Sequence, residues 1–252
     1  MAAADWTRPQ WTRGEAKAML LYCVFGTFAA ELKPDLPACG GRGLPAGVEL
    51  RRIPKAMLAH WDGHPLRGAL GGILRDADPV AFATARSAPE CLLVRGELAD
   101  ADSLAYLGDT LGVIAALLEA GGAVVVDPQI LEIFAADAWR TRYAGAERSA
   151  PRNHVLVLCQ NEADGSAWVR TRGMRKFARP DISIRRVPHA DVQRAGAVAA
   201  RLVDLQARGL RLGDGSTVDV EDVPGGLRVT RAGALDDREF NNTHLELAWP
   251  AA

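Results

Sequence analysis

The stretch at residues 91–126, CLLVRGELADADSLAYLGDTLGVIAALLEAGGAVVV, decides the fold class. Its two ends, 91–98 and 123–126, are apolar runs of the length of buried strands. Between them, apolar side chains recur at spacings of three and four, which places one apolar stripe on one face of a helix. The residues of this stripe are Leu104, Leu107, Leu111, Ile114 and Leu118.

The two ends of this helix also carry signals. Asp102 or Ser103 is available as the N-cap, and Gly121-Gly122 is a typical helix end because glycine accepts positive φ. We therefore predict strand, helix and strand, with both strands in one sheet and the helix on its face.

Beyond residue 150 the pattern changes to short runs rich in β-forming residues. Residues 154–160 and 166–172 flank Asp164-Gly165, which indicates a hairpin. Apolar spacing predicts a helix over 189–208, closed by Gly209. Further strands are expected at 181–187, 216–223, 227–231 and 241–249.

The N-terminal part is expected to contribute extended segments at 20–28 and 48–54, separated by a loop rich in Pro and Gly at 33–47. Short helices are expected at 67–74 and 80–87. One more helix is expected at 133–143.

Together these elements predict an α+β fold, with a mostly antiparallel or mixed sheet and helices packed on one face. The segments 91–126 and 181–208 fit a split βαβ arrangement. Residues 91–252 are expected to form the α+β core, and 1–90 either belong to the same domain or form a small subdomain.

Composition excludes several classes of protein. Hydrophobic residues make up 48% and charged residues 24%, values typical of globular proteins, and the formal net charge of -1 gives no global attraction to DNA or anionic membranes. The longest apolar run, 18–30, is shorter than the roughly 20 residues of a membrane-spanning helix. We expect a cytoplasmic protein and no membrane partner.

The four cysteines form no C-x-x-C pair and match no zinc spacing. Cys23, Cys91 and Cys159 lie in apolar runs and are expected to be buried thiols, whereas Cys39 is the one expected to be exposed. Glycine-rich nucleotide motifs, the G-x-S-x-G elbow and H-E-x-x-H are absent. His60 and His64 lie four apart, but the intervening Asp-Gly favours a turn over a metal pair. No cofactor or metal is expected.

The most basic segment is VRTRGMRKFARPDISIRR at 169–186. It contains seven Arg and Lys residues and one acid, Asp181, so its net charge is 7 − 1 = +6. Such a segment either binds an anionic group through arginine forks or is a solvated strand face paired with acids such as Glu221 and Asp222. The basic residues are Arg170, Arg172, Arg175, Lys176, Arg179, Arg185 and Arg186.

A second polar cluster lies in DDREFNNTHLELAW at 236–249. Carboxylates, amides and an imidazole are ligands for a divalent cation, but the spacing fits no calcium loop, and Asp and Asn also build turns. A structured turn fixed by Phe240 is the simpler interpretation. The residues concerned are Asp236, Asp237, Glu239, Asn241, Asn242 and His244.

The segment WVRTRGMRKFARPD at 168–181 resembles a W-V-x-T-x-G-M-x-K-F-x-x-P-D motif of uncharacterised bacterial proteins classed as domains of unknown function. Residues 121–129 (GGAVVVDPQ) and 240–246 (FNNTHLE) are similar to the same group, and the resemblance covers roughly 90–249. It implies a cytosolic bacterial α+β protein and assigns no catalytic residue.

These observations favour a binding or accessory protein that recognises a protein or a small anionic ligand, with Arg170, Arg172, Arg175, Lys176 and Arg179 as the binding residues. The first alternative is an enzyme whose site combines the 236–244 cluster with the arginines. The second, a nucleic-acid binder, is disfavoured because few aromatic residues interleave with the charges. Whether the protein is an enzyme, and its oligomeric state, are left open.

Overall fold

The computed structural model describes residues 4–32, 42–221, 223 and 225–250, and the chain divides into two compact units. Unit 1 comprises Met1–Trp6, Met19–Leu98 and Ser103–Ala150, and unit 2 comprises Thr7–Ala18, Ala99–Asp102 and Pro151–Ala252. The division therefore does not fall at the expected boundary after residue 90, because the strands on both sides of that point pair in one sheet.

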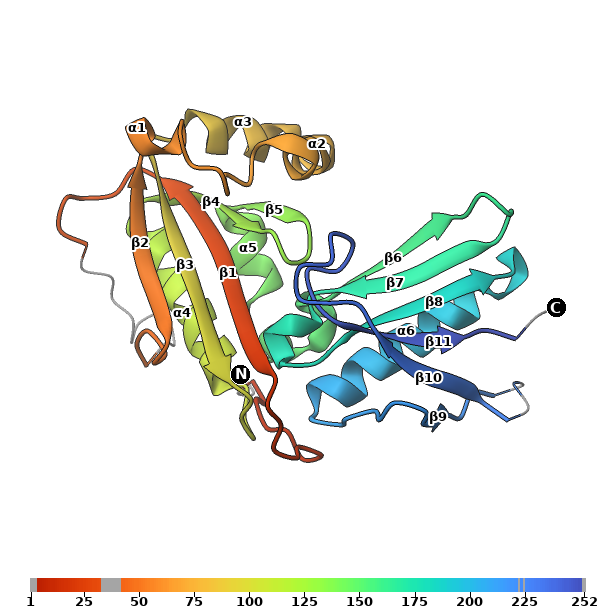
Figure 1. The fold of residues 1–252 in the computed structure, drawn as a ribbon. Helices are drawn as coiled ribbons and strands as arrows, with labels where there is room; N and C mark the ends of the chain where they lie inside the picture. Colours follow the sequence, from red (N-terminus) through yellow and green to blue (C-terminus); the bar gives the residue numbers. More distant parts are fainter. Residues whose placement is uncertain (1–3, 33–41, 222, 224, 251–252) are drawn as a thin grey trace. The chain divides into compact units, whose positions relative to one another are not determined.

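The sheet of unit 1 has the order β2-β3-β1-β4-β5 (Figure 1). Its strands are β1 (Lys17–Gly26), β2 (Val48–Pro54), β3 (Glu90–Ala99), β4 (Gly122–Asp127) and β5 (Glu132–Ala135). Helix α4 (Ala105–Glu119) connects β3 to β4, and β1 lies between these two strands with its arrow opposed to that of β3. Residues 91–126 thus form a split βαβ arrangement by themselves. The segment 181–208, which was expected to share this arrangement, belongs to the other sheet, in unit 2.

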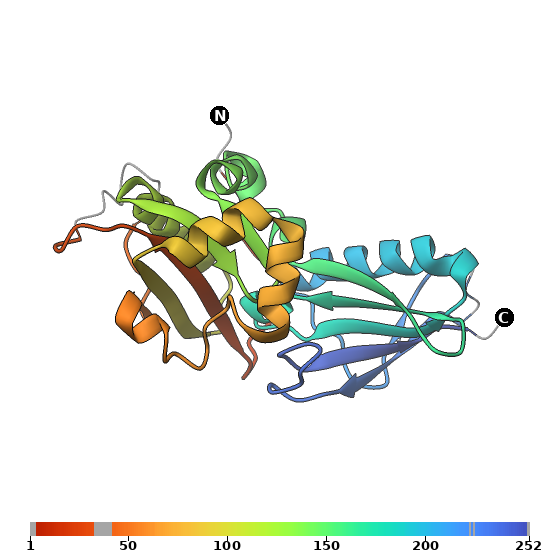
Figure 2. The ribbon, with the colours of Figure 1, turned by 90° about the horizontal axis from the view of Figure 1, so that it is seen from above.

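Helices cover both faces of this sheet, as Figure 2 shows. On one face, α1 (Lys55–Leu58), α2 (Gly68–Ala77) and α3 (Pro79–Ser87) share a core with alternate residues of β1, among them Cys23 and Phe25. On the other face, Tyr22 of β1 contacts Trp139 of α5 (Ala136–Arg142), with ring centroids 5.9 Å apart. Because successive side chains of a strand point to opposite faces, β1 contributes residues to the cores on both faces of the sheet.

Local signals in unit 1 are mostly confirmed. The N-cap of α4 is Leu104, one residue after the predicted Ser103, and the Ser103 hydroxyl accepts a hydrogen bond from the Ala105 amide at 3.1 Å. Gly121 ends the helix with φ +117°, and a Cβ there would lie 2.1 Å from the Thr27 oxygen. The helix predicted at 133–143 was placed too early, because Ile133 and Phe134 belong to β5 and enter the cores on the two faces of the sheet.

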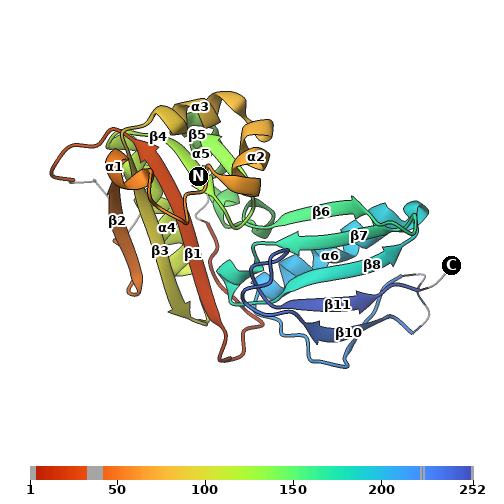
Figure 3. The ribbon, with the colours of Figure 1, turned by 45° about the horizontal axis from the view of Figure 1, so that its top comes forward.

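Unit 2 contains a six-stranded sheet of order β6-β7-β8-β11-β10-β9, whose longer strands lie side by side in Figure 3. Neighbouring strands are antiparallel except β8 and β11, which are parallel. The predicted hairpin around Asp164-Gly165 joins β6 to β7. The strands are β6 (Leu156–Asn161), β7 (Ala167–Arg172), β8 (Asp181–Val187), β9 (Thr217–Val218), β10 (Leu227–Ala232) and β11 (His244–Ala248).

Helix α6 (Val192–Ala207) covers one face of this sheet and packs Leu202 against Val169, Ile184 and Leu247. The predicted start at 189 is a 3-10 turn, His189–Asp191, and Gly209 has φ +106° as expected for the helix end. The other short 3-10 turns are Ala146–Ser149, Pro151–Asn153 and Met174–Phe177. The α+β class with mostly antiparallel or mixed sheets is confirmed.

The cysteines divide differently from the expectation. Cys23 and Cys91 are buried, and a hydrogen bond with Cys91 together with burial raises the pKa of the Cys23 thiol. Cys159 was predicted to be buried, but it is exposed because β6 is an edge strand. Cys39 lies outside the described residues. Within the described ranges, no helix is long and apolar enough to cross a bilayer.

Candidate functional site: the interlocked basic and polar turns of unit 2

The two clusters singled out in the sequence, 169–186 and 236–249, contact each other in unit 2. The Arg170 guanidinium pairs with the Glu239 carboxylate at 2.8 Å. Arg172 donates to the main-chain oxygens of Arg238 and Glu239, and Arg175 donates to that of Asn241 at 3.3 Å. The basic segment thus binds the polar turn of the same chain.

Asp181 holds the two segments together from inside. Its fully buried carboxylate accepts hydrogen bonds from the Thr171 hydroxyl at 2.9 Å, the Met174 amide at 3.3 Å and the Asn242 amide group at 2.8 Å. Burial raises the pKa of Asp181 to about 7, although each of these donors, and the charge of Arg172, act to lower it. These hydrogen bonds to Asp181 fix the turn between β7 and β8, where Gly173 has φ +117°.

Two further residues of the predicted binding set face inward. Lys176 is fully buried and donates to the main-chain oxygen of His154 at 3.2 Å. Arg179 is 3% exposed and pairs with Asp100 at 2.8 Å, and burial lowers the pKa of its guanidinium. Lys176 and Arg179 are therefore built into unit 2.

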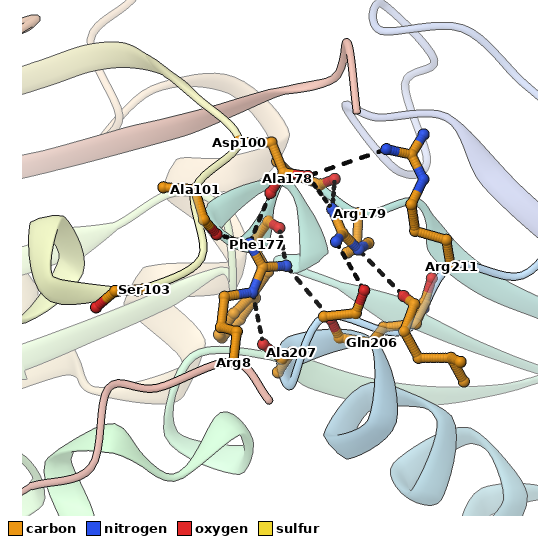
Figure 4. Close-up of polar contacts among 12 residues, drawn as sticks. Arg8, Asp100, Ala101, Ser103, Phe177, Ala178, Arg179, Gln206, Ala207 and Arg211 are labelled. Atoms are coloured by element: carbon orange, nitrogen blue, oxygen red, sulfur yellow. Dashed lines mark hydrogen bonds and ion pairs between the residues drawn. The ribbon is translucent and has the colours of Figure 1, made fainter. Parts of the chain in front are cut away.

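Asp100 is the centre of a buried ion cluster that no sequence motif predicted (Figure 4). Its two oxygens bind Arg8 at 2.6 Å and Arg179 at 2.8 Å, while Arg211 lies 4.0 Å away. Two buried arginines face one carboxylate, so the cluster carries excess positive charge. The segments that meet here are far apart in the sequence, and this is why no local pattern revealed them.

The excess positive charge is balanced at the end of α6. Arg8 donates to the main-chain oxygen of Ala207 at 3.0 Å, and Arg179 donates to those of Gly209 at 2.9 Å and Leu210 at 3.1 Å. The last carbonyls of a helix lack partners within the helix and carry its partial negative charge. Arg8 therefore caps α6, which ends at Ala207, whereas Arg179 satisfies carbonyls of the segment that follows the helix.

The polar turn itself is mainly a structural turn. The Asp237 carboxylate accepts from the amides of Glu239 at 2.9 Å and Phe240 at 3.3 Å, as expected for a turn-forming aspartate. His244 is 9% exposed and stacks on Phe240 at 4.1 Å, and burial lowers the pKa of its imidazole. Asp236 is exposed.

The face of the unit 2 sheet opposite α6 carries a stack of side chains in which Trp168 and Arg170 are buried, at 6% and 8% exposure, and Arg185 is exposed. Here the guanidinium carbons of Arg170 and Arg185 lie 3.9 Å and 3.8 Å from the Trp168 ring centroid. Arg185 also pairs with Glu162 at 2.6 Å, and its side chain is 42% exposed. We call Trp168, Arg170 and Arg185 the stacked triad. Arg170 was predicted as a binding residue, but Trp168 was not, although alternating Arg and Trp on a strand signal stacking.

The acids that pair with the basic segment are not those expected. Glu221 lines a groove near α6 together with Arg194 and Arg201, and Asp222 lies outside the described residues. Among the described residues, no group of three or more His, Cys, Asp or Glu side chains is placed to hold a metal ion.

No match to this chain was found among protein-family models, curated proteins or solved structures. The resemblance of residues 168–181 and 240–246 to bacterial domains of unknown function therefore stays a prediction, as does the cytoplasmic location. The structure does place these two segments against each other, through the contacts of Asp181 with Asn242 and of Trp168 with Phe240.

Proposed function

We propose that unit 2 is a binding module that recognises carboxylate groups of an acidic protein partner at the stacked triad. The observation that carries this proposal is the ion pair between Arg170 and Glu239, whose side chain is 56% exposed. Glu239 occupies the position that a partner carboxylate would take. The Arg170 side chain is 10% exposed and the Glu239 side chain 56% exposed, so Glu239 lies on the solvent side of the pair, where a partner carboxylate can displace it.

The triad suits this role chemically. An arginine stacked on an aromatic ring keeps the N–H donors at its edge for a carboxylate. Gln160 accepts from Arg170 at 3.0 Å and fixes its orientation further. Arg and Trp are also the residue types that most often dominate protein interfaces.

Removal of the internal competitor tests the proposal. A labelled octaglutamate peptide is titrated against wild type, Glu239→Gln and Arg185→Gln, and binding is followed by fluorescence anisotropy. Glu239→Gln should bind up to about fivefold more tightly, the equivalent of about 1 kcal/mol. Arg185→Gln should bind more weakly than wild type.

Glu246→Gln is the matched control, because Glu246 lies two residues from His244 on β11, opposite Ser183, on the same face of the sheet. It removes one negative charge without freeing Arg170. An equal gain in Glu239→Gln and Glu246→Gln, or no gain in either, would contradict the proposal. A labelled single-stranded oligonucleotide is titrated in parallel, and tighter binding to it with a steep loss in salt would favour the nucleic-acid alternative instead.

A further inference from the structure

Unit 1 contains a cavity of about 390 Å³ between α1, the segment that follows it and the end of α3. Cavities of roughly 300–1,000 Å³ are the size that binds small molecules. Its apolar lining includes Leu58, Leu66 and Ala85, which also belong to the core on this face of the sheet.

The charged lining of this cavity is of one sign. Lys55, Arg67 and Arg86 line it, and no carboxylate does so among the described residues. Within the same part of the chain, none of the three cations lies within 4 Å of an acid. All three cations are exposed, and together they give the mouth of the cavity a positive potential that attracts an anion.

Arg67 is held in place by its own chain. Its Nη2 donates to the main-chain oxygens of Leu58 at 3.2 Å and Ala59 at 2.8 Å. Neither Nε nor Nη1 of Arg67 donates to any described residue, so that edge of the guanidinium stays available to a ligand.

His64 adds a neutral donor to the lining. Its Nδ1 accepts from the Leu66 amide at 3.1 Å, so the neutral ring carries its proton on Nε2. Burial, and then the charge of Arg67, lower the pKa of His64. The ring is therefore a hydrogen-bond donor near neutral pH that adds no charge to the three cations.

We propose that this cavity binds a small molecule that carries a phosphate group and an apolar body. Three cations fit a group of charge near −2 better than a single carboxylate, and an arginine fork matches phosphate oxygens in bidentate geometry. The apolar lining holds the remainder of the ligand. This site is independent of the stacked triad of unit 2.

Isothermal titration calorimetry with phenyl phosphate, inorganic phosphate and phenol tests the proposal on the full chain. Phenyl phosphate should bind more tightly than inorganic phosphate, and phenol should bind most weakly. The double variant Lys55→Gln/Arg86→Gln should weaken the binding of phenyl phosphate at least tenfold, whereas Arg86→Lys, which keeps the charge, should retain most of it.

Arg75→Gln is the matched control, because Arg75 lies on the exposed side of α2, pairs with Asp76 and does not line the cavity. Its affinity for phenyl phosphate should equal that of wild type. NMR titration of His64 gives a second readout, since a bound anion raises the pKa of a neighbouring imidazole.

Either of two results would overturn the proposal: no binding of phenyl phosphate at millimolar concentration by wild type, or an equal loss of affinity in Arg75→Gln and the double variant. Equal affinity for phenyl phosphate and inorganic phosphate would contradict the proposal that the apolar lining binds the body of the ligand. Thermal melting of each variant separates a lost site from a lost fold.

Discussion

The basic segment of unit 2 and the cavity of unit 1 use their cations in opposite ways. In unit 2 the charges are dense along the chain, yet Arg172, Lys176 and Arg179 are buried and bonded to main-chain oxygens or to Asp100. In unit 1, Lys55 and Arg86 are far apart in the sequence, yet they line one cavity without acidic partners among the described residues.

The contrast shows that a high density of basic residues along the chain does not by itself make their side chains available to a ligand. A buried arginine is stable only if its donors and its charge are matched inside the protein. The turns and helix ends of unit 2 offer many unpaired carbonyls, and the arginines satisfy them. A run of basic residues can therefore specify a fold, whereas a few separated cations form a site.

The largest effect is expected where the buried charges of unit 2 lose their partner. Asp100→Ala leaves Arg8 and Arg179 without their carboxylate and should destabilise unit 2 by about 3–5 kcal/mol. Hydrogen exchange of the α6 and β8 amides measures this loss in unit 2 alone. A loss below about 1 kcal/mol would show that the carbonyls at the end of α6 suffice.

The next effect is a dependence on pH. The pKa of Asp181 is about 7 in the folded chain and roughly 3.9 in an unfolded one. The folded state therefore binds the proton more tightly, so this contribution to stability is full below about pH 4 and is lost as the pH rises through 7.

The stability of wild type relative to Asp181→Asn should thus fall by roughly 3–4 kcal/mol between pH 4 and pH 8. Urea unfolding of both proteins across this range measures the difference. A flat difference would mean that the donors around Asp181 keep it ionised throughout.

A smaller loss is expected for a single inward arginine. Arg172→Met keeps the length of the side chain but removes the donors to the carbonyls of the 236–244 turn, which should cost about 1.5–3 kcal/mol. Faster exchange of the β11 amides should accompany the loss. Unchanged exchange would contradict this prediction, because it would show that the donors of Arg172 do not hold the 236–244 turn in place.

The smallest effect is expected in unit 1. Lys55→Gln removes an exposed cation that has no acidic partner in the described part of the chain, so stability should change by less than about 0.5 kcal/mol. Urea unfolding measures it. A larger loss would assign Lys55 a structural role and weaken the case for a ligand site.

Features with a local physical cause were predictable from the sequence. Asp164-Gly165 fixed the β6–β7 hairpin, and Gly121 and Gly209 marked helix ends because both have positive φ. The apolar periods located α4 and α6. The helix expected at 133–143 failed at its start, because Ile133 and Phe134 follow a helical pattern locally but complete the sheet through pairing with β4.

Features that depend on distant pairing were not predictable. The parallel pairing of β8 with β11 joins Ile182 to Leu245, and the Asp100 cluster joins Arg8 to Arg179. Neither has a local signal. The sequence did identify both clusters of unit 2, but not that one binds the other, because pairing of Arg170 with Glu239 requires the complete sheet.

The most direct test of the contrast follows the arginine Nε–Hε signals in an NMR titration with inorganic phosphate. The signals of Arg67 and Arg86 should shift at the lowest phosphate concentrations, whereas those of Arg172 and Arg179, held inside unit 2, should not. Shifts of Arg172 and Arg179 ahead of Arg67 and Arg86 would contradict the account.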